Sequence, residues 1–298
     1  MKLKKLSPRD KKVFHKFLFR QRRELAVFAW ENIFIWQGLF EISWAVIEGS
    51  LCIFFRDKWG IFLYLPPLGA KPTSGLIKQI FAQLDSVNRN QEISRIENLE
   101  ENDLADIRQL GLDCKIKSQD YCCLRSDLAG LSGNKYKSQR AANNYFIKNY
   151  CYEYLPFSQK DSSGCLKLYR QWESVRKAAN PDAVYQGMLE DSRNSLQVAF
   201  DNYRRLDLTG GIVKIDGQVK AFSFGYKLNS DTFCILYEIT DLSIKGLAQF
   251  IFQRFCRDLS GFKYINIMDD SGLENLKKVK LSYHPVRLIP AYIAKRKP

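Results

Sequence analysis

The sequence predicts an α/β (α+β) protein with two domains, each a mixed, mostly antiparallel sheet flanked by helices. Three observations predict this class. The chain has 298 residues, roughly twice the length of an average domain. Its composition, 46% hydrophobic and 26% charged, is ordinary for packed globular proteins. One order of elements, a hairpin followed by a strand and a helix, occurs once in each half of the chain.

Each copy of this repeat begins with a β-hairpin signal. In the first half, β-rich runs flank Glu48-Gly49, and in the second half they flank Asp216-Gly217. An acidic residue followed by glycine suits the positive backbone φ angles of a two-residue hairpin turn. We therefore expect hairpins over residues 45–55 and 211–225.

The strand and the helix after each hairpin complete the repeat. Strands are expected at Gly60–Leu65 and Thr232–Ile239, and amphipathic helices begin at Gly75 and Gly246. The repeat predicts two copies of one unit rather than one large fold. We place the N-terminal domain at residues 1–132 and the C-terminal domain at residues 133–298, with helical residues 133–206 leading into the second sheet.

The remaining elements follow from caps and periodicity. Ser7 and Pro8 begin a helix that is expected to run to about Arg23. Further helices are expected at 134–150, 164–179, 183–206 with a break near Ser192, and 271–281, and strands at 263–267 and 286–294.

The charge of the chain favours anionic partners. Lys and Arg number 46 against 32 Asp and Glu, which gives a net charge of +14. Such a field attracts nucleic acid, phosphate-bearing molecules or anionic lipid. Part of it lies on the first helix, whose basic face is either simply solvated or binds RNA.

Several classes of protein are excluded by composition. Polar residues interrupt the most apolar stretch, 33–47, so no integral membrane segment is expected, and no signal-peptide core follows the basic N terminus. The chain is therefore expected in the cytoplasm. Eight cysteines without a CxxC pair, and only two histidines, predict reduced thiols and no metal site.

Longer motifs carry a resemblance to a known family. These are Pro66–Gly69 (PPLG), Asp120-Tyr121, Leu128–Tyr136 (LAGLSGNKY), Gln139-Arg140 with Asn144, and the stretch Tyr264–Pro285. Together they resemble the phosphatidylglycerol lysyltransferase C-terminal domain family over nearly the whole chain. The resemblance implies tandem GNAT-like acyltransferase domains related to the Fem-type aminoacyltransferases.

The resemblance also implies a function. Well-understood members of this family move an aminoacyl group from a charged tRNA to an amine or hydroxyl. We therefore expect an acyltransferase with aminoacyl-tRNA or acyl-CoA as co-substrate and no tightly bound cofactor. The expected acceptor is a small molecule or a lipid headgroup, and tRNA is an expected partner. The alternative is a non-catalytic GNAT-like binding module, which Gln139, Ile239 and Met268 favour because they depart from the family pattern.

Acyl transfer to an amine needs an oriented carbonyl, a donor for the developing oxyanion and a route for the amine proton. GNAT-like sites take the oxyanion donor from a splayed central strand, which corresponds here to residues 236–241. The candidate catalytic residues are Glu238, Asp270, Asn266 and Tyr283. Each has a structural alternative: a solvated acid for Glu238 and Asp270, a strand-end cap for Asn266, and core packing for Tyr283.

Cationic and glycine-containing segments form the candidate donor site. Ser243–Ala248 resembles a weak form of the GNAT cofactor loop, and its alternative is an ordinary helix start. The candidate residues are Arg140, Lys137, Ser243, Lys245, Gly246 and Lys280. We expect the helices that carry Arg140 and Lys280 to form an anion cradle at a cleft between the domains, and the alternative is one solvated face on each helix.

Overall fold

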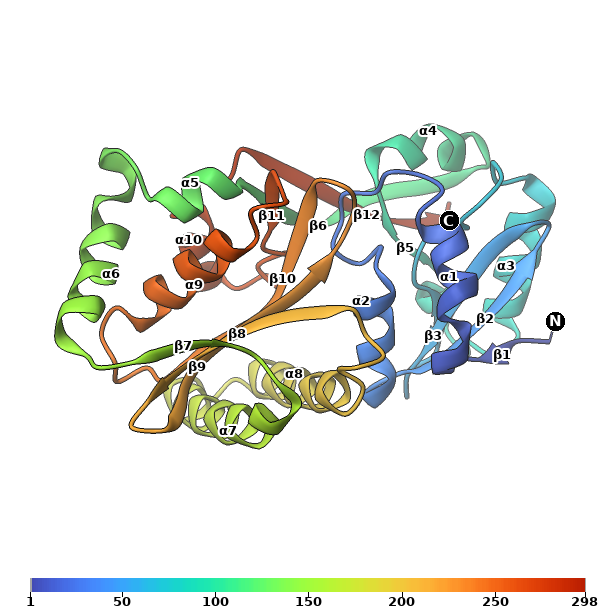
Figure 1. Cartoon of the computed structure of the whole chain (residues 1–298). Coiled ribbons are helices and arrows are strands. Elements are labelled where there is room, and N and C mark those ends of the chain that lie inside the picture. The colour runs from blue at the N-terminus through green and yellow to red at the C-terminus, as the bar shows by residue number, and fades with distance from the viewer. Residues whose placement is uncertain (1, 298) are drawn as a thin grey trace. The chain divides into compact units, whose positions relative to one another are not determined.

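The computed structural model describes residues 2–297 and divides into two compact units (Figure 1). Within the described residues, unit 1 comprises 2–120, 269–272 and 288–297, and unit 2 comprises 121–268 and 273–287. The chain therefore enters unit 2 at Tyr121, earlier than the boundary at 132/133 that we expected. The C-terminal segment, which we expected in the second domain, lies in unit 1.

Unit 1 is a sheet with helices packed against it, and its strands are ordered β1-β2-β3-β4-β5-β12-β6. The strands are β1 (Lys4–Lys5), β2 (Glu41–Ile47), β3 (Ser50–Arg56), β4 (Ile61–Leu63), β5 (Ile96–Leu99), β6 (Leu112–Leu124) and β12 (Arg287–Arg296). The helices are α1 (Lys11–Leu18), α2 (Trp30–Ile35), α3 (Ser74–Asp85) and α4 (Glu101–Gln109).

Alternating side chains of β3 give unit 1 a core on each side of its sheet. Cys52 and Phe54 belong to a buried cluster with the apolar stripe of α3. Phe55 points to the opposite side, where its ring stacks on Tyr64 with a centroid separation of 3.9 Å. Such two-sided burial is what a continuous apolar run in a strand predicts.

Unit 2 contains the strand order β6-β11-β10-β9-β8-β7. Its other strands are β7 (Glu153–Pro156), β8 (Leu208–Ile215), β9 (Gln218–Lys227), β10 (Thr232–Thr240) and β11 (Tyr264–Asn266). Its helices are α5 (Arg125–Gly130), α6 (Lys137–Asn149), α7 (Ser162–Ala179), α8 (Ala183–Asp201), α9 (Leu247–Asp258) and α10 (Glu274–Leu281).

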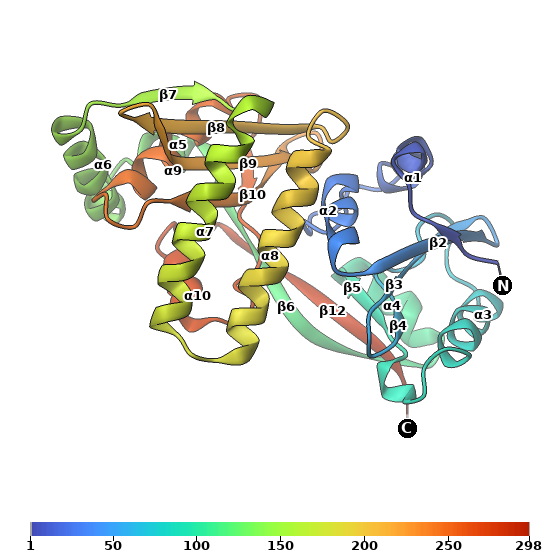
Figure 2. The same ribbon diagram turned by 90° about the horizontal axis from the view of Figure 1, so that it is seen from below.

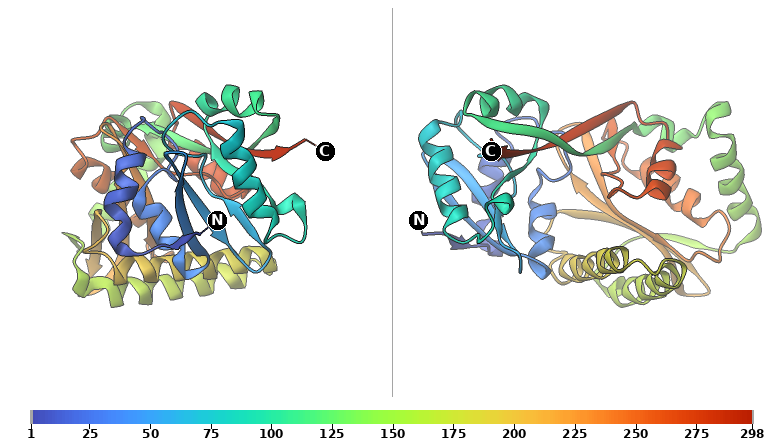
Figure 3. Two further views of the ribbon diagram at one scale, coloured as in Figure 1. Left: turned by 90° about the vertical axis from the view of Figure 1, so that its right-hand side faces the viewer. Right: turned by 180° about the vertical axis from the view of Figure 1, so that it is seen from behind.

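The sheet of unit 2 is covered on both faces. Helices α7 and α8 run side by side along one face (Figures 2 and 3). On that face Phe222 and Phe224 of β9 contact the ring of Phe200 in α8. On the other face Ala221 and Val213 pack in a cluster with Ile251 of α9. The side chains of β9 therefore alternate between the two helical layers, as strand geometry requires.

The predicted repeat is confirmed. Hairpin β2–β3 is followed by β4 and α3, and hairpin β8–β9 is followed by β10 and α9. Both hairpin turns have positive φ at the acid and at the glycine, for example 50° at Asp216 and 73° at Gly217. These angles explain the choice of residues, because glycine adopts positive φ without steric cost and aspartate tolerates it.

Two details of the predicted elements are wrong. Helix α8 runs through Ser192 without a break, because Leu189 and Leu196 on either side are both buried in the core. The first helix ends at Leu18 rather than near Arg23, whose guanidinium pairs with Asp103 at 2.8 Å in unit 1. Strand β7 was not predicted, and it lies in the gap between the helices expected at 134–150 and 164–179. In residues 2–297, no helix has both the length and the apolarity to cross a membrane.

Candidate active site around Glu238

The central strand of unit 2, β10, contains a β-bulge. Ile235 pairs with Gly225 of β9, and Tyr237 pairs with the adjacent residue Phe224, so Leu236 is the extra residue. A Cβ atom on Gly225 would lie only 1.8 Å from the carbonyl oxygen of Cys234. Only glycine allows the two backbones to approach this closely, which is a recognised role of glycine in bulged strands.

The bulge decides which face of the sheet Glu238 occupies. Before it, Phe233 and Ile235 pack in the cluster that contains the apolar stripe of α9. After it, Tyr237 packs on Phe224, on the face covered by α7 and α8, with ring centroids 5.2 Å apart. The alternation is thereby inverted, and Glu238 lies on the α9 face opposite Ser223 of β9. A regular strand would have directed this carboxyl toward α8.

The bulge also lies where β10 and β11 separate. Parallel pairing joins Thr232–Cys234 to Tyr264–Asn266 and ends there, whereas β10 continues to Thr240. Beyond Cys234, this edge of β10 is therefore no longer paired with β11, and the backbone N–H groups farther along it form no ladder with that strand. Such groups can donate hydrogen bonds to a carbonyl oxygen that becomes negatively charged during acyl transfer.

Glu238 is a carboxyl whose pKa lies well above its ordinary value. Its side chain is partly buried and forms no hydrogen bond or ion pair with any residue in the described range 2–297. Burial raises its pKa to about 8, and the charge of Lys280 opposes this rise. A carboxyl whose pKa lies near neutrality can accept a proton from an amine and release it again.

Tyr283 and Lys280 accompany Glu238 from the segment around α10. The ring of Tyr283 packs on Phe252 of α9, with centroids 4.3 Å apart. Burial and the charge of Glu238 raise the pKa of the Tyr283 hydroxyl well above its ordinary value, so this hydroxyl keeps its proton at neutral pH. The ammonium of Lys280 donates a hydrogen bond to the carbonyl of Ile267 and lies 6.0 Å from the ring centroid of Tyr121.

Two further residues of this site were missed by sequence reasoning. The Ser223 hydroxyl is fully buried beside Glu238 and has no hydrogen-bond partner in the described part of the chain. The Cys256 thiol of α9 has a raised pKa, through burial first and the charge of Glu238 second. The interior glycine at 225 is the one signal in the sequence that marks an irregular strand at this point.

Asn266 and Asp270 both accept backbone N–H groups in the segment that follows β11. Asn266 is fully buried at the end of β11, and its side-chain oxygen accepts the N–H of Met268 at 2.7 Å. This hydrogen bond corresponds to the strand-end cap that the sequence analysis gave as the structural alternative for Asn266. Asp270 belongs to the segment 269–272 of unit 1, where its carboxylate accepts the N–H of Gly272 at 3.0 Å.

The loop before α9 satisfies many of its own polar groups. Asp241 accepts hydrogen bonds from the N–H and the hydroxyl of Ser243, at 3.1 and 2.6 Å. Although burial acts to raise the pKa of Asp241, contacts with Ser243 and Lys220 hold it below its usual value, so this carboxylate is ionised and pairs with Lys220 at 3.1 Å. The ammonium of Lys245 lies 4.7 Å from the ring centroid of Tyr145. The N–H and the hydroxyl of Ser243 are therefore already used by Asp241, which makes this loop a poor cradle for a phosphate.

Gly246 is required by packing. Its φ is 83°, and a Cβ atom there would lie 2.1 Å from the carbonyl oxygen of Ala142 in α6. The backbone of α6 thus approaches the first turn of α9 directly. Close helix packing accounts for this glycine without a bound phosphate.

The two helical segments expected to carry the donor cradle do meet. The Gln139 side chain donates to the carbonyl of Ser282 at 2.8 Å, and the Tyr136 hydroxyl donates to the carbonyl of Tyr283 at 3.0 Å. Arg140, however, donates to the carbonyls of Leu131 and Gly133, so it stabilises the turn before α6. Lys137 is exposed.

Comparisons with known proteins agree with this architecture. A protein of unknown function from Bacteroides thetaiotaomicron is 28% identical, with a TM-score of 0.88, and the match covers 99% of each chain. L-PGS from Bacillus licheniformis (15% identity, TM-score 0.68, 99% of this chain and 93% of that chain) and FemX (8%, 0.60, 100% and 98%) share the fold.

No curated protein matches the sequence. The fold shared with the solved structures is the tandem GNAT-like fold, with mostly antiparallel strands flanked by helices, as the sequence predicted. The family model described as phosphatidylglycerol lysyltransferase, C-terminal, matches residues 24–295. Because this match spans nearly the whole sequence, the chain belongs to that family.

Proposed function

We propose that this protein is an acyltransferase that moves an aminoacyl or acyl group from a phosphate-bearing donor to an amine or hydroxyl acceptor. The observation that carries the proposal is Glu238, a partly buried carboxyl with a pKa of about 8 just after the bulge in β10. A carboxyl without a hydrogen-bond partner is costly to bury, and such groups are concentrated at functional sites.

In the proposed reaction, the acceptor nitrogen attacks the acyl carbonyl carbon and gives its proton to Glu238. N–H groups on the free edge of β10 hold the negatively charged carbonyl oxygen of the tetrahedral intermediate. The intermediate then expels the donor oxygen or sulfur, which takes a proton from the Tyr283 hydroxyl. Glu238 returns its proton to Tyr283 through solvent, so the atoms and charges balance and both residues are restored.

Between the two candidate donors, we favour aminoacyl-tRNA over acyl-CoA. In the loop that would bind the phosphates of a CoA, Asp241 already accepts the N–H and the hydroxyl of Ser243, and the carbonyl of Ala142 approaches Gly246 at the start of α9 closely. A net charge of +14 suits a tRNA-sized polyanion. The similarity to FemX and to L-PGS is consistent with this choice.

The test uses purified protein with a mixture of radiolabelled aminoacyl-tRNAs or with labelled acetyl-CoA, together with a cell extract as source of acceptors. We expect stable transfer of label from aminoacyl-tRNA and a loss of about 100-fold or more in Glu238→Gln, the range for a general base. The control is Lys148→Gln, which changes an exposed side chain of α6. Transfer by Glu238→Gln at the wild-type rate contradicts the role of Glu238.

A second candidate, a non-catalytic binding module, is favoured by one observation. The two cations expected to bind the donor phosphates, Arg140 and Lys280, donate hydrogen bonds to backbone carbonyls of the protein itself. If this function is correct, wild-type protein binds tRNA in a salt-dependent manner but transfers label from neither donor. Substitution of Glu238, Arg140 or Asp270 then leaves the cellular phenotype unchanged.

A further inference from the structure

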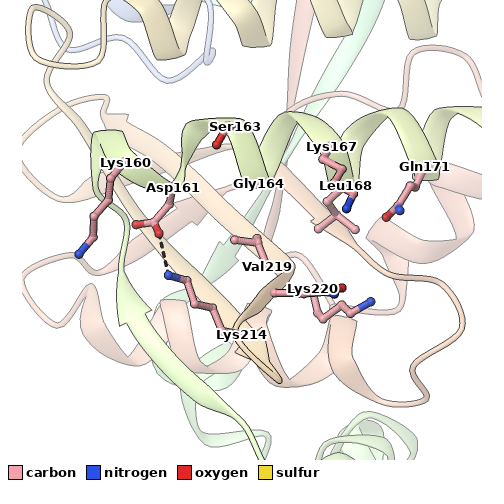
Figure 4. A pocket seen from close by; sticks show the side chains of 12 residues that line it. Lys160, Asp161, Ser163, Gly164, Lys167, Leu168, Gln171, Lys214, Val219 and Lys220 are labelled. Atoms are coloured by element: carbon pink, nitrogen blue, oxygen red, sulfur yellow. Dashed lines mark ion pairs between the residues drawn. The ribbon is translucent and has the colours of Figure 1, made fainter.

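Unit 2 contains a basic pocket away from Glu238. It lies between the first turns of α7 and the β8–β9 hairpin, and its volume is about 250 Å³ (Figure 4). The lining contains four lysines and a single acidic residue: Lys160, Lys167, Lys214 and Lys220, with Asp161. Helix α7 covers the face of the sheet opposite to the one that carries Glu238, so this pocket is separate from the candidate active site.

A second β-bulge shapes this pocket. Val213 pairs with Ala221 and Lys214 pairs with Val219, so Lys220 is the extra residue in β9. Ala221 faces α9, whereas Val219 is turned toward α7, as Figure 4 shows. A Cβ atom on Gly164 would lie 2.9 Å from a methyl group of Val219, so the absence of a side chain at Gly164 lets helix and hairpin approach.

The charges in the pocket are only partly neutralised. Lys214 pairs with Asp161 at 2.8 Å, and Lys220 pairs with Asp241, which is not part of the lining, at 3.1 Å. Lys160 and Lys167 form no ion pair with any residue between 2 and 297. In the view of Figure 4, Lys160 lies at one end of the pocket, and Lys167 and Gln171 lie at the other.

We propose that this pocket binds the phosphoryl groups of a small phosphorylated ligand, such as a phosphate monoester or a diphosphate. The ammonium groups of Lys160 and Lys167 are not offset by a carboxylate, because Lys214 and Lys220 are the two that pair with Asp161 and Asp241. The side chains of Ser163, Gln171 and Gln218 add hydrogen-bond donors. The first turn of the 18-residue helix α7 adds the positive end of its dipole.

The lining also indicates that the ligand has no nucleobase. It contains no aromatic side chain, so there is no platform on which a nucleobase could stack. Leu168 and Val219 form an apolar wall, and the site is a concavity rather than an extended flat surface. These features favour a compact phosphorylated molecule over a nucleic-acid strand. The proposal stands independently of the acyltransferase function.

The test is isothermal titration of the purified full chain with inorganic pyrophosphate at low ionic strength. We expect binding to weaken by about tenfold in Lys167→Gln and in Lys160→Gln, because each removes one charge-assisted contact. Lys148→Gln removes the same charge from α6, outside the pocket, and is expected to bind like the wild type. Hydrogen exchange of the bound protein is expected to slow within residues 160–171 and 214–220.

Three results would overturn the proposal. One is wild-type affinity in both lysine variants, and another is an equal loss in Lys148→Gln, which would indicate non-specific attraction to the net charge. The third is an absence of pyrophosphate binding together with a lysine-dependent affinity for tRNA or for vesicles of anionic lipid. Glu238→Gln is expected to bind pyrophosphate like the wild type. Pyrophosphate binding and acyl transfer are therefore tested independently, and one proposal can fail without the other.

Discussion

Glu238 and Ser223 face each other across β10 and β9, and neither side chain forms a hydrogen bond within residues 2–297. The Ser223 hydroxyl is fully buried, and burial raises the pKa of Glu238 to about 8. Burying polar groups without partners opposes folding, and this is the reason why we propose a functional role for Glu238.

The first prediction concerns stability as a function of pH. Glu238 has a folded pKa of about 8 against a reference value of 4.5, so between these pH values the folded protein holds a proton that the unfolded chain releases. The free energy of unfolding therefore falls as the pH rises from about 4.5 to about 8 and then stays level with respect to this group.

Glu238→Gln removes this dependence. Relative to the wild type, the variant is expected to gain about 1–3 kcal/mol between pH 5 and pH 9, a range reduced from the full shift because the carboxyl keeps some contact with solvent. Chemical denaturation of both proteins at several pH values measures the difference. Parallel curves for the two proteins over this range would show that the carboxyl titrates normally.

The second prediction separates the roles of two tyrosines. Tyr283→Phe is expected to change stability by less than about 0.5 kcal/mol, because its hydroxyl forms no hydrogen bond within residues 2–297, yet to slow acyl transfer. Tyr136→Phe is expected to cost about 1 kcal/mol, since its hydroxyl donates to the carbonyl of Tyr283. Thermal unfolding and transfer assays of both variants give the comparison, and a large loss of stability in Tyr283→Phe would contradict it.

The third prediction tests the bulge in β10. Gly225→Ala places a methyl group 1.8 Å from the carbonyl oxygen of Cys234, so the strands must shift. We expect a loss of about 3 kcal/mol in stability, because overpacking distorts the backbone. Gly261→Ala is the control, since the new atom meets nothing within 4 Å. Equal stability of the two variants in urea denaturation would show that the bulge is not needed.

The fourth prediction compares two glycines next to or within helices. Gly246→Ala is expected to destabilise unit 2 by about 2–4 kcal/mol, because φ is 83° and the methyl group would meet the carbonyl of Ala142 at 2.1 Å. Gly187→Ala, in the open interior of α8, is expected to stabilise the protein by about 0.5–1 kcal/mol. Changes of the same sign in thermal unfolding would refute the assignment of Gly246 to helix packing.

Much of the local structure was predictable from the sequence, because it depends on neighbouring residues. The acid–glycine turns, the period-2 strands and the amphipathic helices are short-range patterns, and they identified both copies of the repeat. Errors arose where tertiary contacts override local preference. Arg23 pairs with Asp103, far along the chain, and Ser192 lies in a helix held by buried leucines on both sides.

In the candidate site, too, some features follow from the sequence and others only from the tertiary structure. The sequence by itself determined the tandem GNAT-like fold and identified Glu238, Tyr283 and Lys280 as candidates, because these rest on element order and motifs. Only the tertiary structure decided that the bulge at Leu236 turns Glu238 toward α9, and that Arg140 stabilises a turn. A one-residue bulge inverts the face of every later side chain in the strand, and the pairing of two strands distant in sequence decides where it occurs.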